Sequence, residues 1–271
     1  MSRIFQINKK IFPFTKKIKI SGDKSLSIRW VLLASQAVGK SRAYNLLMSQ
    51  DVLSAIDSIK KLGIKVKITD NYCEIYGNGI NGFKYKKNLQ LNAKNSGTLA
   101  RLILGLLIKS PLKVKLIGDN SLSKRDFLRV TLPLEKFGAK FYYKKRGRLP
   151  LSILGSKSVK GINYFENKGS AQCKSSVMLA ALSASGTTSI KAKKSRNHSE
   201  LLFKYLKIPI KVKITKKYDF IDIKPPRKIP AFNYQIPGDI SSSAFFVALT
   251  TLANDSILLI KNVNINSSRI G

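Results

Sequence analysis

The stretch Gly22-Asp23-Lys24-Ser25-Leu26-Ser27-Ile28-Arg29 opens the first of four similar segments in this sequence. Small polar residues and cations come first, and an apolar run with helical spacing follows over residues 30–37. Comparable openings lie near Ser96, Ser170 and Ser241, at successive spacings of 71, 74 and 71 residues. Self-similarity at a fixed spacing predicts a repeated structural unit.

Each complete unit is predicted to contain a helix, a strand, a second helix and a hairpin. In the first unit, Asp51 is expected to cap a second helix over residues 52–62, and alternating residues predict strands at 64–68 and 72–76. The next two units predict the same order, at 99–108, 114–117, 127–137, 140–143 and 149–154, and at 175–182, 187–192, 199–206, 210–215 and 219–223. The fourth offers only a helix at 242–252 and a strand at 256–261 before Gly271.

This pattern predicts an α/β (α+β) fold with three complete helix-strand-helix-hairpin units and a truncated fourth. Such a unit buries its apolar face by stacking on its neighbours, so we expect the sequence to be part of a longer protein. Pro225 and Pro226 interrupt the regular pattern after the third unit. We therefore expect a three-unit domain at 20–225, a linker at 226–235, and an incomplete second domain made of 1–19 and 236–271.

The charge of the chain is strongly positive. Among its 271 residues, 50 Lys and Arg face 14 Asp and Glu, which gives a formal net charge of +36. Only eleven of the basic residues are arginine, and the lysines are spread along the whole length. Two interpretations stay open: a solvated surface with a biased composition, or a face that binds polyanions, for which Lys144-Lys145-Arg146 is the best candidate.

Cysteine and histidine are too scarce for a metal or disulfide framework. Cys73 and Cys173 lie far apart, and His198 is the one histidine. Residues 1–19 lack a continuous apolar stretch, and no later run reaches the length of a membrane span. We expect a soluble cytoplasmic protein without a metal site.

The four openings are candidate anion sites. At the start of a helix, free backbone N–H groups and the positive end of the helix dipole favour phosphate or carboxylate groups. Ordinary N-capping explains any single opening equally well. Four openings that converge on one cleft would bind a ligand with several negative charges.

The opening motifs resemble those of the enolpyruvylshikimate-phosphate synthase family. The first motif is the stretch at 22–29, and the second is Asn95-Ser96-Gly97-Thr98-Leu99-Ala100-Arg101. The others follow in order: Gly118-Asp119 with Lys124-Arg125, Ser170-Ala171-Gln172, Ser195-Arg196-Asn197-His198, and Pro237-Gly238-Asp239-Ile240-Ser241-Ser242. The resemblance runs from about residue 20 to the last residue, and it implies the repeated α/β fold of enolpyruvyl transferases.

The resemblance also implies two sets of binding residues. Shikimate 3-phosphate would be bound by Lys24, Ser25, Arg29, Ser170, Ala171, Gln172 and Ser195. Phosphoenolpyruvate would be bound by Lys24, Asn95, Gly97, Arg125 and Gln172. Lys24 would contact both substrates, and Arg29 would reach a carboxylate through a bidentate pair.

The implied reaction transfers the enolpyruvyl group of phosphoenolpyruvate to the 5-hydroxyl of shikimate 3-phosphate and releases phosphate, a step in aromatic amino-acid biosynthesis. It requires no cofactor, and the family acts as a monomer. Its acid and base carboxylates would lie beyond Gly271, so the catalytic residues stay unknown and we expect this chain alone to be inactive.

The sequence departs from the family pattern at one position beside a predicted binding residue, and it leaves alternative functions open. Asp126 stands where the family has proline, and it would either weaken the neighbouring Arg125 or cap a helix. Arg101 and Arg196 are either surface or interdomain cations, and His198 is interpreted as a packing residue. UDP-N-acetylglucosamine enolpyruvyl transferase is an alternative that predicts a reactive cysteine in the second unit, where this sequence has none. A nucleic-acid-binding protein is supported by charge alone.

Overall fold

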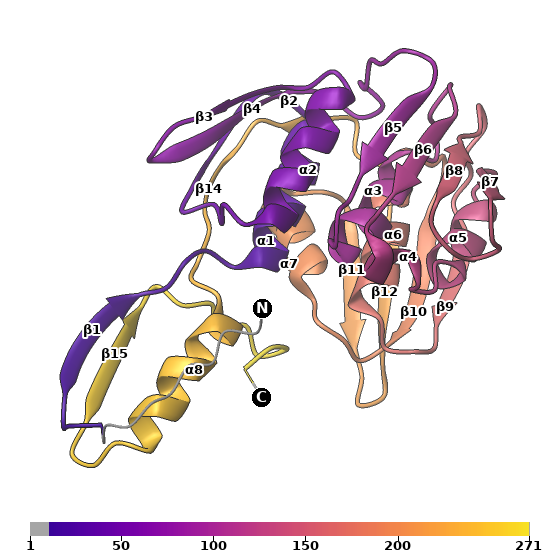
Figure 1. The fold of residues 1–271 in the computed structure, drawn as a ribbon. Coiled ribbons are helices and arrows are strands. Elements are labelled where there is room, and N and C mark those ends of the chain that lie inside the picture. The colour runs from indigo at the N-terminus through magenta and orange to yellow at the C-terminus, as the bar shows by residue number, and fades with distance from the viewer. Residues whose placement is uncertain (1–10, 271) are drawn as a thin grey trace.

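The computed structural model describes residues 11–270, so the expected roles of residues 1–10 and 271 in a second domain lie outside the described residues. Figure 1 shows a large part with three sheets and a small part with one helix and two strands. The mixed α/β class predicted from the sequence is present.

The first sheet of the large part packs against two helices. Its central strand is β2 (Ala37–Tyr44), which pairs with the hairpin of β3 (Lys65–Ile68) and β4 (Tyr72–Asn78) through β4. Its helices are α1 (Lys24–Ser35) and α2 (Gln50–Lys61). Ser49, rather than the expected Asp51, occupies the N-cap position of α2. The Asp51 carboxylate lies in the first turn instead, 3.0 Å from the Lys24 ammonium.

The second and third sheets have the same strand order. In each, the first strand along the chain is at one edge and pairs in parallel with the second, and the remaining pairings are antiparallel. The second sheet contains β5 (Leu89–Asn92), β6 (Val114–Ile117), β8 (Leu151–Leu154) and β7 (Lys140–Tyr143), with helices α3 (Gly97–Leu106), α4 (Asn120–Ser123) and α5 (Leu128–Glu135). The third contains β9 (Asn163–Glu166), β10 (Thr188–Lys193), β12 (Tyr218–Ile223) and β11 (Ile210–Ile214), with helices α6 (Ala171–Ala181) and α7 (His198–Tyr205). The sequence analysis missed β5 and β9, which pair in parallel with β6 and β10.

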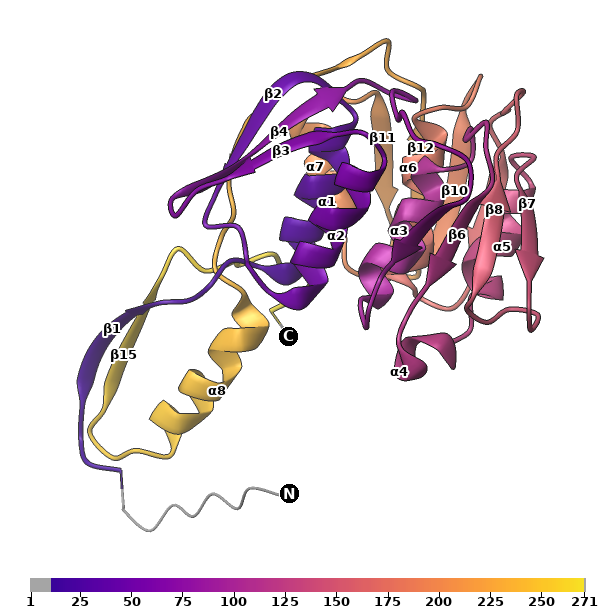
Figure 2. The same cartoon turned by 45° about the horizontal axis from the view of Figure 1, so that its top comes forward.

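Helices α1, α3 and α6 form the centre of the large part, with the sheets outside them (Figure 2). Ten of the twelve residues of α1 are buried, as are eight of ten in α3 and nine of eleven in α6. A helix whose residues are buried on nearly every side requires neighbours on every side. Gly105 permits a close approach of α3 to α6, because a Cβ there would lie 2.2 Å from the Ser176 carbonyl oxygen of α6.

Residues 226–235, expected as a linker, add two short strands to the first sheet. Both β13 (Ile229–Pro230) and β14 (Asn233–Gln235) pair in parallel with β2. The Phe232 N–H donates to the Ser41 hydroxyl at 3.1 Å, and the Tyr205 hydroxyl donates to the Asn233 carbonyl at 2.8 Å. Proline is tolerated here because the strand lies at a sheet edge.

The small part consists of α8 (Ile240–Thr251), β15 (Ile257–Lys261) and β1 (Thr15–Lys19). The two strands are parallel, with Thr15 opposite Ile257. Two segments that join the two parts lie side by side, with backbone hydrogen bonds from Asp23 to Pro237 and from Asp239 to Ser21. Within residues 11–270, no helix combines the length and the apolar character that a bilayer crossing requires.

Candidate functional site

A cavity of about 410 Å³ lies where the first turns of α1, α6 and α7 meet. Six of the residues predicted for shikimate 3-phosphate line it: Ser25, Arg29, Ser170, Ala171, Gln172 and Ser195. Its other lining residues include Thr98, Arg196, His198 and Ser268. Among the described residues, the lining contains cations, hydroxyls and amides, and no carboxylate.

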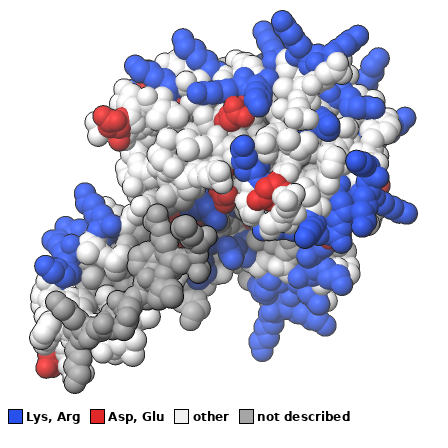
Figure 3. All heavy atoms as spheres, viewed as in Figure 1, with Lys and Arg blue, Asp and Glu red and all other residues white. Residues whose placement is uncertain are grey.

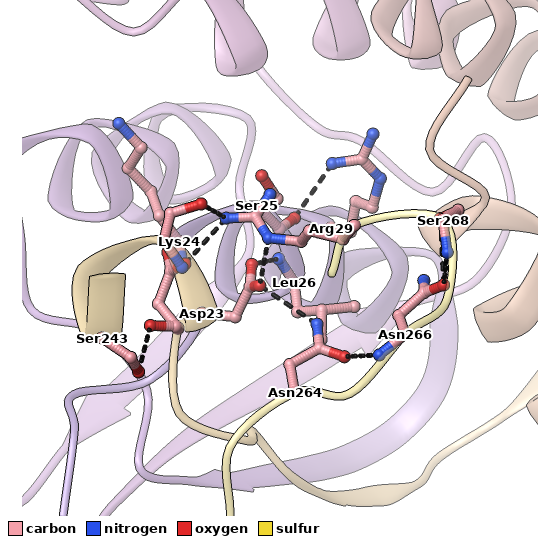
Figure 4. Close-up of polar contacts among 12 residues, drawn as sticks. Asp23, Lys24, Ser25, Leu26, Arg29, Ser243, Asn264, Asn266 and Ser268 are labelled. Carbon is pink, nitrogen blue, oxygen red and sulfur yellow. Dashed lines mark hydrogen bonds and ion pairs between the residues drawn. The ribbon is translucent and has the colours of Figure 1, made fainter. Parts of the chain in front are cut away.

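The α1 opening supplies the fixed cation of the cavity. Asp23 is the N-cap residue, and its carboxylate accepts a hydrogen bond from the Leu26 N–H (Figure 4). The Arg29 guanidinium donates to the Ser199 hydroxyl at 2.9 Å, to the Ser175 hydroxyl at 3.0 Å and to the Ser25 carbonyl at 3.0 Å. Burial lowers the pKa of Arg29 to about 10, which still leaves it charged at neutral pH. Three hydrogen bonds therefore hold a buried cation in one orientation.

The α6 opening supplies hydroxyl and amide groups. The Ser170 hydroxyl caps α6 by accepting from the Cys173 N–H at 3.3 Å, and the buried Glu166 carboxylate accepts from the Ser170 N–H at 2.8 Å. The Gln172 amide joins α6 to α3, because it donates to the Thr98 hydroxyl at 3.0 Å and accepts from Arg101 at 2.9 Å. Arg101 is therefore a link between two helices rather than a free surface cation.

Four predicted site residues lie outside this cavity: Lys24, Asn95, Gly97 and Arg125. The Arg125 guanidinium donates to the Asn95 side chain at 3.1 Å, and Asn95 in turn donates to the Asp119 carboxylate at 2.5 Å. A Cβ on Gly97 would lie 2.9 Å from an Arg125 nitrogen and 2.8 Å from an Arg101 nitrogen. The missing side chain thus lets two guanidinium groups approach the start of α3, which forms a second cationic cluster.

The carboxylates near the motifs are all engaged in structural roles. Asp23, Asp119 and Asp239 are N-cap residues of α1, α4 and α8. Glu200 lies 2.5 Å from the Lys174 ammonium in a buried ion pair between α7 and α6. Phe127, rather than Asp126, occupies the N-cap position of α5, and the Asp126 carboxylate accepts a hydrogen bond from the Leu128 N–H at 2.8 Å from one residue before it.

Comparison with known proteins identifies the family of the chain. A family model described as EPSP synthase (3-phosphoshikimate 1-carboxyvinyltransferase) matches residues 9–271. The chain belongs to the EPSP synthase family. The 3-phosphoshikimate 1-carboxyvinyltransferase of Bacillus subtilis is 39% identical over 257 residues, and that of Streptococcus mutans is 40% identical over 256 residues. Each match covers 94% of this chain and 59% of the relative, so the chain spans about three fifths of the length of these relatives.

Solved structures of the EPSP synthase family share the fold. The EPSP synthase of Acinetobacter baumannii superposes with a TM-score of 0.85 at 31% sequence identity, over 95% of this chain and 58% of that chain. The family resemblance predicted from the motifs is confirmed, as is the mixed α/β fold.

His198, which the sequence analysis interpreted as a packing residue, faces the cavity. It lines the cavity at the start of α7, its residue is 2% exposed, and neither ring nitrogen has a hydrogen-bond partner among the described residues. Burial, followed by the nearby Arg29 charge, lowers its pKa to about 3. The imidazole is therefore neutral and has a free N–H to donate to an anion. Its place as the last residue of the motif at 195–198 was the available signal.

Ser268 is a cavity residue that the sequence analysis missed. It lies beyond β15, in no recognised motif, and it reaches the cavity only through the tertiary fold. In the part of the chain that the structure describes, no three His, Cys, Asp or Glu residues are grouped as metal ligands would be.

Proposed function

We propose that the complete protein transfers the enolpyruvyl group of phosphoenolpyruvate to the 5-hydroxyl of shikimate 3-phosphate and releases phosphate. The observation that carries this proposal is the cavity at the helix openings, where six of the predicted shikimate 3-phosphate residues meet around the buried Arg29 cation. The family membership of residues 9–271 supports the same reaction. The EPSP synthases compared above are longer than this chain, so the reaction is proposed for the complete protein.

The cavity suits shikimate 3-phosphate for electrostatic and geometric reasons. Arg29 presents a fixed planar fork, which matches a carboxylate better than a flexible ammonium would. The N-terminus of α6 favours the phosphate, since backbone N–H groups and the helix dipole both attract negative charge there. The hydroxyls of Ser170 and Ser195 and the amide of Gln172 would bind the ring oxygens.

The second cationic cluster would bind phosphoenolpyruvate. Arg125, Asn95 and the backbone at Gly97 form its floor, and the resemblance adds Lys24 and Gln172. Lys24 is paired with Asp51 at 3.0 Å, and its side chain is 48% exposed, so it is free to exchange this partner for a ligand phosphate. Asp119 supports the cluster by orienting Asn95.

Proton transfer would require an acid and a base, and among the described residues the carboxylates near the motifs are already engaged. The reaction protonates the vinyl carbon and removes the hydroxyl proton, whereas the four carboxylates near the motifs are N-caps or ion-paired. We expect no phosphate release from phosphoenolpyruvate when the 271-residue chain is assayed alone with shikimate 3-phosphate. Measurable turnover, in a preparation free of host enzyme, would contradict this assignment.

Residues 20–225 are proposed as one domain of three helix-strand-helix-hairpin units, and residues 236–271 as an incomplete fourth unit with 1–19. The equivalent strand orders of the second and third sheets, and the pairing of β1 with β15, support this division. Residues 229–235 belong with the first sheet in this scheme. The complete protein is expected to act as a monomer without a cofactor.

Two other functions, nucleic-acid binding and UDP-N-acetylglucosamine enolpyruvyl transfer, can be tested against this proposal. Figure 3 shows Lys and Arg distributed over both parts of one face, which is the basis of the nucleic-acid alternative. The second candidate, UDP-N-acetylglucosamine transfer, lacks the cysteine that it predicts between Cys73 and Cys173. Thermal unfolding of the chain, measured with shikimate 3-phosphate, UDP-N-acetylglucosamine or a single-stranded RNA, would distinguish the three. We expect only shikimate 3-phosphate to raise the Tm at 150 mM salt, and a shift with RNA or the nucleotide sugar alone would overturn the proposal.

A further inference from the structure

The segment after β15 returns to the cavity from the small part of the molecule. Residues 264–269, here called the polar strap, begin at Asn264, whose N–H donates to the Gly238 carbonyl at 2.9 Å. Figure 4 shows Asn264, Asn266 and Ser268 lying beside the first turn of α1. No motif of the sequence analysis includes this segment.

Both ends of the polar strap contact the N-cap residue of α1. The Asn264 amide donates to the Asp23 carboxylate at 3.1 Å, in a buried contact. The Arg269 side chain, only 6% exposed, lies 3.5 Å from the same carboxylate and 2.7 Å from the Asp239 carboxylate. Asp23 and Asp239 are the N-caps of α1 and α8, so a single guanidinium links the starts of two helices. Because two buried carboxylates repel each other, this cation keeps both caps in place.

The middle of the polar strap holds the N-cap of α7. The Asn266 amide and the Ser268 hydroxyl both donate to the Asn197 side-chain oxygen, at 2.8 and 2.9 Å. The Asn197 N–H donates to the Ser268 hydroxyl, with 3.3 Å between nitrogen and oxygen. Ser268 itself lines the cavity. The same short segment therefore contacts both helix openings and the space between them.

We infer that the polar strap is part of the shikimate 3-phosphate site, with Ser268 as a ligand contact and Arg269 as a positioning residue for α1. The inference rests on the proposed function and deepens it. Ser25 and Arg29 are on α1, and His198 is on α7, and the polar strap joins these two helices in addition to the Arg29–Ser199 hydrogen bond. Ser268 adds a hydroxyl on the side of the cavity that no other residue of the small part reaches among the described residues.

The first test compares Ser268→Ala with Ser267→Ala in the 271-residue chain, by isothermal titration with shikimate 3-phosphate. Loss of one hydrogen-bonding hydroxyl should weaken binding by about three- to tenfold. Ser267 is the matched control, because it is the exposed neighbour and lines no part of the cavity. Equal affinity of the two variants would overturn the role of Ser268.

The second test compares Arg269→Gln, Arg269→Lys and the control Arg227→Gln. Arg227 is exposed and its loss changes the net charge equally, so the control reports any general charge effect. We expect Arg269→Gln to weaken binding at least tenfold, Arg269→Lys to recover part of the affinity, and Arg227→Gln to bind normally. A purely structural role would lower the Tm of Arg269→Gln without changing its Kd, and that result would overturn the positioning role.

Failure of this inference can be distinguished from failure of the proposed function. If the unsubstituted chain binds no shikimate 3-phosphate, both the proposed site and the role of the polar strap are wrong. If the unsubstituted chain binds and both Ser268→Ala and Arg269→Gln bind equally well, only the role of the polar strap is wrong. If Arg269→Gln does not fold, Ser268→Ala decides whether the polar strap is part of the site, because it removes a single hydroxyl from an exposed residue.

Discussion

Helices α6 and α8 begin alike and end in different surroundings. Each has a side-chain N-cap, Ser170 in α6 and Asp239 in α8, and each continues with small and apolar residues. Yet α6 buries nine of its eleven residues, whereas α8 buries only Ser243 of its twelve. The local sequence therefore specifies the helix, while its neighbours decide how much of it is buried.

The difference in burial between α6 and α8 implies a difference in how much each helix contributes to stability. Apolar area contributes about 25 cal/mol per Å² only when it is removed from water. Phe245 is 81% exposed and Leu252 is 78% exposed, and the apolar residues of β15 alternate between partly and largely exposed. In the described chain the small part is therefore held mainly by the β1 pairing, the two hydrogen-bonded connecting segments and the polar strap.

Two Phe→Ala substitutions, one in a buried helix and one in α8, test this difference in burial most strongly. Phe203→Ala, at a position with 0% exposure in α7, should lower the free energy of unfolding by about 3–5 kcal/mol. Phe245→Ala in α8 should change it by less than about 0.5 kcal/mol. Chemical denaturation of both variants checks the contrast. A large loss for Phe245→Ala would show that α8 is covered in solution.

A second contrast concerns charge. Lys174→Met leaves the buried Glu200 carboxylate without its partner, and such losses are about 3 kcal/mol or more. Lys261→Met removes an exposed lysine that lies beside Lys19 on β1, with an effect within about 0.5 kcal/mol. Thermal unfolding of the two variants at equal salt would measure both. Equal stability of the two variants would contradict the burial of this ion pair.

The smallest expected effect depends on pH. The pKa of His198 is about 3 in the folded chain, below its ordinary value near 6.5, so the unfolded state binds the proton more readily. His198 thus leaves stability intact above about pH 6.5 and reduces it as the pH falls toward 3, by about 1.4 kcal/mol at pH 5.5. His198→Gln should remove this part of the pH dependence. Parallel stability profiles of both proteins between pH 7.5 and 5.5 would contradict a neutral buried imidazole.

The sequence predicted the helix openings because N-capping and helical spacing are local properties. It missed β5 and β9 because both are short and contain polar residues, and they are recognised by their parallel pairing with β6 and β10. It treated residues 226–235 as a linker because prolines hide edge strands, which β2 then pairs with.

The site was predicted only as far as the motifs reach. Ser25, Arg29 and the residues at 170–172 carry recognisable signals, and the structure brings them to one cavity. The pairing of Lys24 with Asp51, the free imidazole of His198 and the approach of Ser268 all depend on contacts between distant segments. Such contacts leave no spacing pattern in a single sequence.

The most direct test of the account is the affinity of the 271-residue chain for shikimate 3-phosphate, measured by titration calorimetry with Arg29→Ala and the exposed control Arg227→Ala. Arg29 is a buried, three-times hydrogen-bonded cation, so its loss should weaken binding by about a hundredfold or more, while the control binds as the unsubstituted chain does. Absence of binding by the unsubstituted chain, or equal affinity of Arg29→Ala, would contradict the assignment of this cavity.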